Sequence, residues 1–169
     1  MALRPYLLLD IDGPLNPYRA KAIPPGYHLE EIEEGEKTWK LLLNPHHGVE
    51  LTALAEIFEL AWATTWEHGA NRLIAPRLGL PDDLPVIVWP PGARDGAELR
   101  RRCWKTPHVA RWVGSRPFLW IDDEINRYDR FYLESTDGVG AFHLHRIEAN
   151  RGLTPADFTA IRAWGEGQR

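Results

Sequence analysis

The segment Tyr6-Leu7-Leu8-Leu9-Asp10-Ile11-Asp12-Gly13 decides the fold of this chain. Five of its first six residues are apolar, which predicts a buried strand. Two carboxylates at the end of such a strand are costly to bury unless a cation or a reaction needs them. Gly13 allows a sharp exit, and Pro14 and Pro17 keep the next residues out of a helix. Open α/β sheets place their ligand sites at this end of a strand.

Composition predicts one soluble globular domain that spans residues 1–169. The chain is long enough for a single core, and its 44% apolar and 26% charged residues are ordinary for this class. A net charge of −4 does not favour nucleic-acid binding through bulk charge. The single cysteine, Cys103, excludes an internal disulfide and fits a reducing compartment. With no membrane-length apolar run and no signal-peptide pattern, we expect a cytoplasmic protein.

Strand and helix patterns alternate along the chain. The expected strands are 6–11, 60–63, 85–89, 118–121 and 140–147, and the expected helices are 48–60, 66–78 with a bend near Pro76, 106–113 begun by a Thr106 cap, 124–133 and 154–164. This alternation predicts an α/β fold, a Rossmann-like three-layer sandwich around a parallel sheet of about five strands.

The segment 19–45 interrupts this alternation. Gly35 separates two runs of extended character, 27–34 and 37–43, which predicts a β-hairpin. The hairpin follows the first strand, so we expect it to stand as a small flap beside the end of that strand.

Polar side chains follow three of the expected strands. They are Asp10 and Asp12 after the first, Thr64 and Thr65 after the second, and Asp122 and Asp123 after the fourth, with Lys105 just before a helix. In a parallel sheet these strand ends meet at one edge. Oxygen ligands select Mg²⁺. A carboxylate can act as nucleophile through an aspartyl-phosphate, while a hydroxyl and an ammonium hold phosphoryl oxygens. The set predicts phosphoryl transfer.

The order Asp-x-Asp-Gly, Thr, Lys, Asp-Asp resembles the haloacid dehalogenase (HAD) superfamily over residues 6–123. The Trp-Ala-Thr-Thr-Trp-Glu stretch at 62–67 is similar to the small HAD domains associated with RNA-repair proteins. The resemblance implies a Mg²⁺-dependent phosphatase that hydrolyses phosphomonoesters. Pro14 departs from the family pattern, which usually has Thr or Val there, and so bears on the subfamily more than on the chemistry.

The resemblance also implies a role for each reacting residue. Asp10 would attack phosphorus, and Asp12 would act first as general acid for the leaving alcohol and then as general base for water. Thr64, or Thr65 if the strand ends one residue later, would hold a phosphoryl oxygen. Lys105 would offset the negative charge of phosphate and nucleophile.

The metal ligands implied are the Asp10 side chain, the Asp12 backbone carbonyl and Asp122. Asp123 would be a further ligand or a hydrogen-bond partner of one. Gly13 is expected beside the substrate, because it turns the chain back toward the leaving group.

Simpler structural roles compete with these functions. An Asp-x-Asp pair can be a turn, and Asp122-Asp123-Glu124 can cap a helix. Thr64 can bond backbone, and Lys105 can be a surface lysine. The contrasting class of function is a non-catalytic module with the HAD fold that binds a phosphorylated ligand or a protein partner.

The substrate class has two candidates. Family members often carry a cap domain, but the segment 19–45 has room only for a flap, and such an open site suits either a nucleic-acid end or a small molecule held by a partner chain. A basic run, Arg94, Arg100, Arg101, Arg102 and Lys105, is either a solvated face or a lip for a polyanion, with Arg101 in contact with substrate. Trp39, Trp66 and Trp89 either stack on a base or pack the core.

Overall fold

The computed structural model describes residues 3–169. Four parallel strands form the central sheet in the order β4-β1-β5-β6. They are β1 (Tyr6–Leu9), β4 (Glu59–Trp62), β5 (Phe118–Asp122) and β6 (Phe142–Arg146). Leu9 pairs with Trp62 on one side and with Ile121 on the other. The carboxyl ends of the three neighbouring strands β4, β1 and β5 are therefore level.

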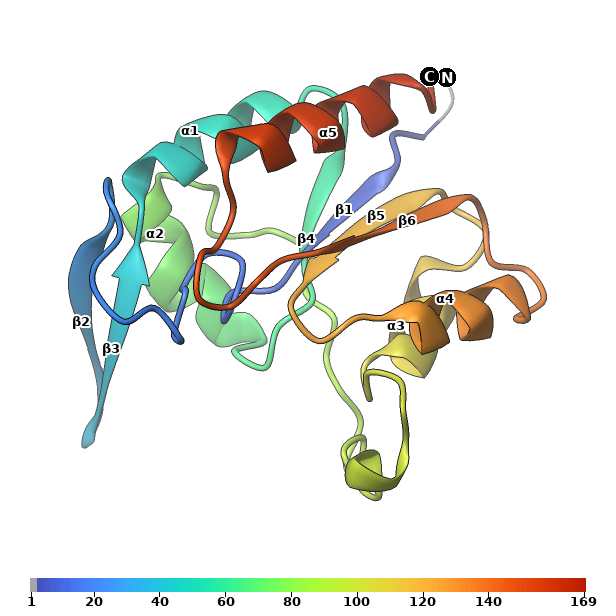
Figure 1. The fold of residues 1–169 in the computed structure, drawn as a ribbon, viewed down its shortest axis with the longest axis horizontal. Helices are drawn as coiled ribbons and strands as arrows, with labels where there is room; N and C mark the ends of the chain where they lie inside the picture. The colour runs from blue at the N-terminus through green and yellow to red at the C-terminus, as the bar shows by residue number, and fades with distance from the viewer. Residues whose placement is uncertain (1–2) are drawn as a thin grey trace.

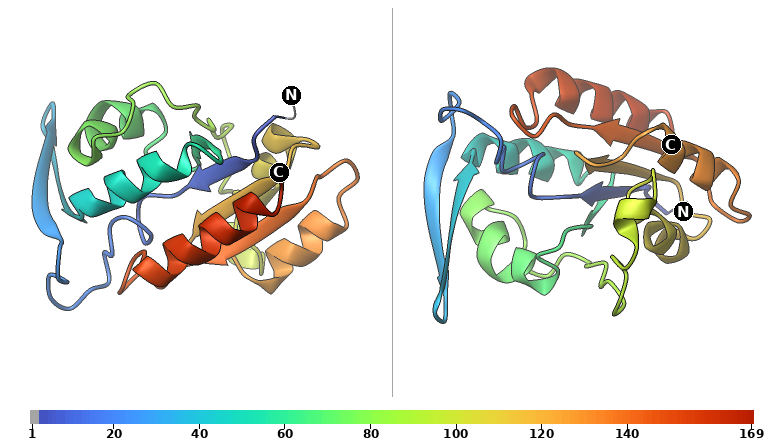
Figure 2. Two further views of the ribbon diagram at one scale, coloured as in Figure 1. Left: turned by 90° about the horizontal axis from the view of Figure 1, so that it is seen from above. Right: turned by 60° about the horizontal axis from the view of Figure 1, so that its bottom comes forward.

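Helices cover both faces of this sheet, which confirms the three-layer α/β architecture (Figure 1). The helices α1 (Pro45–Leu54) and α5 (Pro155–Glu166) lie over one face, and α3 (Thr106–Val113) and α4 (Arg127–Glu134) lie over the other (Figure 2). Side chains alternate along β1 accordingly. Leu7 and Leu9 enter the core beneath α1 and α5, while Leu8 enters the core beneath α3 and α4.

The predicted strand over 85–89 is wrong apart from one bridge. Val86 pairs in parallel with Trp62 at the edge of the sheet, and no ladder continues from it. Pro85 has no N–H to extend the ladder in one direction, and the N–H of Trp89 donates to Glu67 Oε1 at 3.4 Å instead of extending it in the other. Within residues 3–169, the sheet therefore has four strands and a single bridge beside β4, rather than about five strands.

Two helix starts differ from their predictions. Helix α1 begins at Pro45 rather than residue 48, because the Asn44 side chain caps it by accepting from His46 N. Thr106 is not a cap: it is the first residue of α3, and its hydroxyl donates to Asp129 instead. The helices predicted over 124–133 and 154–164 appear as α4 and α5, each with a capping box, around Asn126 and Thr154 respectively.

The helix predicted over 66–78 is shorter and has two parts. A π-helical turn, η1 (Ala70–Ile74), leads into the short α2 (Ala75–Leu78). Pro76 lies at the start of α2. Proline has no N–H for the regular i−4 bond, which accounts for the irregular turn before it. The helix is thus irregular just before Pro76, near which the sequence predicts it to be broken or bent.

The segment 19–45 contains the predicted hairpin, β2 (His28–Glu34) and β3 (Lys37–Leu43), paired antiparallel. Ile32, Leu41 and Leu43 bury its inner face in the core beneath α1. In Figure 1 the hairpin stands at the left of the molecule, and a loop with the short helix η2 (Ala97–Leu99) projects below α3.

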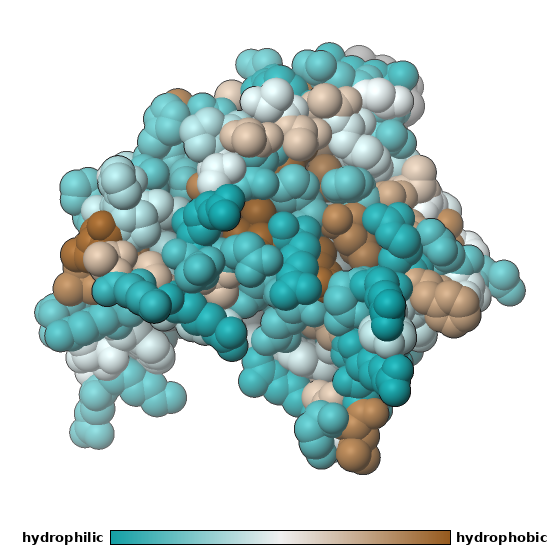
Figure 3. Space-filling model, viewed as in Figure 1, coloured by the Kyte–Doolittle hydropathy of each residue, from teal (hydrophilic) through white to brown (hydrophobic). Residues whose placement is uncertain are grey.

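Hydrophilic side chains cover most of the face in Figure 3. Among residues 3–169, no helix is long and apolar enough to cross a membrane.

Candidate active site

The candidate site lies at the carboxyl ends of β1 and β5. Asp10 directly follows β1, and Asp122 is the last residue of β5, the strand paired with β1. Both carboxylates are buried, with 5% of Asp10 and 0% of Asp122 exposed. The edge predicted from the sequence thus brings two acids together in the interior.

Lys105 joins these two acids. Its side chain is 3% exposed, and Nζ lies 2.7 Å from Asp122 Oδ2 and 3.2 Å from Asp10 Oδ2. The same Nζ donates to the carbonyl of Ala63, the residue after β4 has ended, at 3.1 Å. One ammonium therefore links the ends of three neighbouring strands, and the reading of Lys105 as a surface lysine is wrong.

Burial and charge act in opposite directions on this pair. Burial by itself lowers the pKa of Lys105, but Asp10 and Asp122 outweigh it and raise the pKa above its ordinary value. Burial raises the pKa of Asp10, Lys105 opposes that rise, and the negative charges of Asp122 and Asp12 add to it. The net effect raises the pKa of Asp10 above its ordinary value, so ionisation of this carboxyl depends on nearby positive charge.

Asp123 completes a cluster of acids. Asp10, Asp122 and Asp123 each offer a carboxylate oxygen, and these oxygens lie within 4.8 Å of one another. Three carboxylates thus gather where Lys105 supplies one ammonium, which contacts Asp10 and Asp122. The all-oxygen donor set and the excess negative charge fit a hard divalent cation such as Mg²⁺.

Gly13 makes room for Asp123. Its φ of +106° favours glycine, and a Cβ at this position would lie 2.6 Å from Asp123 Cγ. Asp123 also accepts a hydrogen bond from Tyr18 Oη at 2.9 Å. Burial, followed by the charge of Asp122, raises the pKa of Asp123. Gly13 is predicted beside the substrate, and in the structure it lies next to Asp123.

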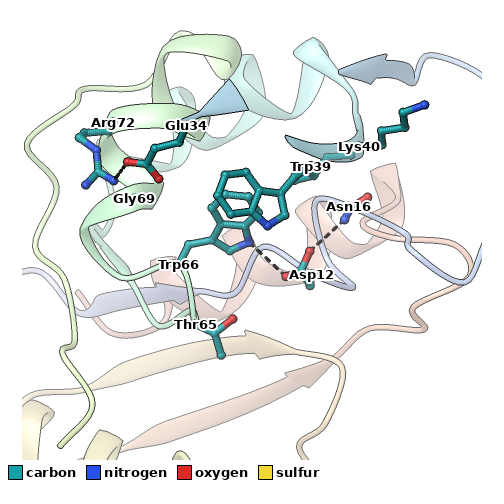
Figure 4. A pocket seen from close by; sticks show the side chains of 10 residues that line it. Asp12, Asn16, Glu34, Trp39, Lys40, Thr65, Trp66, Gly69 and Arg72 are labelled. Carbon is teal, nitrogen blue, oxygen red and sulfur yellow. Dashed lines mark hydrogen bonds and ion pairs between the residues drawn. The ribbon is translucent and has the colours of Figure 1, made fainter. Parts of the chain in front are cut away.

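Asp12 is not part of this cluster of acids and lines a cleft (Figure 4). Its Oδ2 accepts from Trp66 Nε1 at 3.1 Å, and its Oδ1 accepts from Asn16 Nδ2 at 2.9 Å. Asn16 in turn accepts from Leu42 N of the flap at 2.9 Å. Asp12 is therefore held by a residue after β4 and by a residue tied to the flap.

The two threonines occupy different environments. Thr64 is fully buried, and its hydroxyl accepts from Trp66 N at 3.2 Å. Thr65 is exposed and lines the same cleft as Asp12. Thr64 thus has the backbone contact expected of its structural role, while Thr65 is the hydroxyl open to the cleft.

Asp129 fixes the segment that carries Lys105. It is fully buried on α4, and it accepts from Cys103 N at 2.8 Å and from the Thr106 hydroxyl at 2.5 Å. A third bond comes from Asn126 N at 2.8 Å. Because Lys105 lies between Cys103 and Thr106, these bonds anchor the chain on both sides of it.

Arg101 does not join the acids. Its Nη1 bonds Tyr128 Oη at 3.0 Å, and Arg94 and Arg102 lie over the rings of Trp104 and Tyr132, both at 4.7 Å. Lys105 is buried, whereas Arg101 is exposed in the loop before α3 and contacts α4 through Tyr128, so the two do not form one basic surface.

Sequence reasoning missed Asn16 and Asp129, and it did not foresee the bond from Trp66 to Asp12. The capping pattern Asn126-x-x-Asp129 marks Asp129 as a helix-start residue, but not its contacts with α3. Asn16 carries a weaker signal, a buried polar side chain four residues after Asp12 in a proline-rich turn.

No family model matches this chain, and no curated protein or solved structure matches it either, so the chemistry of the site rests on its own residues.

Proposed function

We propose that the protein is a Mg²⁺-dependent phosphatase of the HAD type, which hydrolyses phosphomonoesters through an aspartyl-phosphate at Asp10. The observation that carries the proposal is the position of Lys105 Nζ, between Asp10 and Asp122 at the ends of paired strands. A buried ammonium that touches a candidate nucleophile and a candidate metal ligand suits a site that gathers negative charge.

Asp10, Asp122 and Asp123 would hold the cation. Bound there, Mg²⁺ would offset the charge that phosphate brings and would polarise the phosphoryl group. Lys105 would supply a fixed positive charge beside Asp10, which favours the ionised nucleophile.

The proposed reaction has two displacements. An Asp10 carboxylate oxygen forms a bond to phosphorus, and the bond from phosphorus to the leaving oxygen breaks while Asp12 gives that oxygen a proton. Water then attacks the phosphoryl group, Asp12 takes the proton, and Asp10 leaves as the carboxylate. Thr65 on the cleft and Thr64 behind it are the hydroxyls available to a phosphoryl oxygen.

The proposed substrate is a phosphorylated small molecule or a nucleic-acid end. The flap supports an open site, because it is a two-stranded hairpin rather than a separate cap. Comparing end-phosphorylated oligonucleotides with nucleotides and sugar phosphates distinguishes the two substrates. We further propose a reducing, cytoplasmic setting, since Cys103 is the only cysteine of the chain and is buried.

The direct test is hydrolysis of an aryl phosphate in the presence of Mg²⁺. Asp10→Asn should abolish turnover, because an amide oxygen is a poor nucleophile. Asp82→Asn, an exposed carboxylate, is the matched control and should retain the wild-type rate. Retained turnover in Asp10→Asn would overturn the assignment of the nucleophile.

The alternative function is a non-catalytic module that binds a phosphorylated ligand or a protein partner. Calorimetric titration separates the two. Binding of Mg²⁺ and phosphate without turnover of any substrate would favour the module, while turnover that requires Mg²⁺ would exclude it.

A further inference from the structure

We propose that the cleft beside Asp12 receives the leaving group and selects a planar aromatic one, such as the base of a nucleotide. The inference rests on the proposed function, because it assigns a place to the part of the substrate that Asp12 would protonate. We call this space the tryptophan cleft, after its lining residues Trp39 and Trp66.

Two chain segments build the tryptophan cleft. Trp39 comes from β3 of the flap, and Trp66 follows β4 (Figure 4). Their ring centroids lie 5.3 Å apart with planes tilted by 56°. The space has a volume of about 380 Å³, within the range of about 300–1,000 Å³ typical of small-molecule sites. Both indoles are half-buried, so part of each ring remains available to a ligand.

The position of Asp12 indicates how a leaving group would lie in the tryptophan cleft. Asp12 and Thr65 line it, and the Asp12 carboxylate is held there by Trp66 Nε1 at 3.1 Å and Asn16 Nδ2 at 2.9 Å. A general acid must lie within hydrogen-bond reach of the oxygen that it protonates. A leaving group whose oxygen meets Asp12 therefore extends along the indoles.

The charges at the rim favour a neutral leaving group over a second anion. Arg72 forms an ion pair with Glu34, and Lys40 lies 3.4 Å from Glu31. Each cation at the rim thus has an acidic partner on the flap. With the rim charges paired and the wall aromatic, the feature left for recognition is stacking on a flat ring.

Stacking of a base on an aromatic side chain contributes on the order of 5- to 150-fold in affinity. A nucleotide should therefore be hydrolysed more efficiently than the same phosphate without its base. Adenosine monophosphate and ribose 5-phosphate form such a pair, since both carry the phosphate on the same sugar oxygen.

The competing explanation is that the indoles only fasten the flap, since both also pack against the core. The ratio of kcat/KM for the two substrates separates these roles. Loss of folded protein lowers both rates by the same factor and leaves the ratio unchanged, whereas loss of stacking lowers the ratio itself.

The experiment measures this ratio in wild type and three variants with Mg²⁺ present. Wild type should favour adenosine monophosphate at least ~5-fold, and Trp39→Leu should bring the ratio close to one. Trp164→Leu is the matched control, because Trp164 lies on α5 against Phe58, and it should keep the wild-type ratio. Trp66→Phe keeps a ring but removes the donor to Asp12, so kcat should fall for both substrates while their ratio stays near the wild-type value.

A wild-type ratio near one, or a ratio unchanged in Trp39→Leu, would overturn the inference. If neither substrate is hydrolysed, the proposed function fails. Calorimetric titration then tests ligand binding at the tryptophan cleft without turnover. Tighter binding of adenosine monophosphate than of ribose 5-phosphate, reduced in Trp39→Leu, supports the tryptophan cleft as a ring-binding site. Equal binding of the two ligands overturns it.

Discussion

Replacing Lys105 by methionine should destabilise the protein strongly. The substitution keeps an unbranched apolar stem of similar length and removes the ammonium that contacts Asp122 at 2.7 Å and Asp10 at 3.2 Å. The two carboxylates would remain buried, at 0% and 5% exposure, without their cation. Removing one partner of a buried ion pair costs about 3–5 kcal/mol. For a chain of this size, that loss lowers Tm by roughly 6–20 °C.

Urea unfolding followed by circular dichroism, in EDTA at neutral pH, measures this loss without bound metal. Lys40→Met is the matched control: Lys40 pairs with Glu31 at the surface, where both side chains are more than half exposed, and its removal should change the free energy of unfolding by less than ~1 kcal/mol. The variant Lys105→Met with Asp122→Asn should be less unstable than the sum of the two single variants, because it buries one charge fewer. A loss below ~1 kcal/mol in Lys105→Met, or strict additivity in the double variant, would refute the reasoning.

Three further predictions concern other buried groups. Burial, helped by His46, lowers the pKa of His47 to about 4. The free energy of unfolding should therefore be highest above the unfolded pKa of about 6.5 and should fall by at most ~3 kcal/mol as the pH drops toward 4. Urea unfolding at pH 7.5 and 4.5 should show this loss in wild type and a smaller one in His47→Phe. Gly13→Ala should lower the free energy of unfolding by ~1–3 kcal/mol and weaken Mg²⁺ binding in calorimetry, because the new Cβ would meet Asp123. Gly138 also has a positive φ, of +83°, but open space around it, so Gly138→Ala is the control. Equal effects of the two variants would contradict a role for the contact with Asp123. Asp129→Ala removes the acceptor of three hydrogen bonds and should lower the free energy of unfolding in urea by ~3 kcal/mol or more. The exposed Asp137→Ala is the control. An equally small change in both variants would show that Asp129 does not anchor the chain around Lys105.

Much of the fold could be predicted from local patterns. The apolar run that ends at Asp10 predicts β1, Gly35 predicts the hairpin, and the alternation of elements predicts helices on both faces. The segment 85–89 has the composition of a strand, but it forms only one bridge, because Pro85 has no N–H and the N–H of Trp89 donates to the Glu67 side chain. Composition within a segment therefore predicts its conformation better than its pairing, which depends on donors and neighbours outside it.

The sequence by itself determined which acids end up at one edge, since the carboxyl ends of parallel strands meet there. Asp10 and Asp122 follow from that rule alone. Only the tertiary structure placed Lys105 in the interior between them, and only it directed Arg101 away to Tyr128. Trp66 reaches Asp12 across 54 residues. Runs, caps and turns are set by residues a few positions apart, whereas these contacts arise when α3, the flap and the end of β4 pack around the sheet.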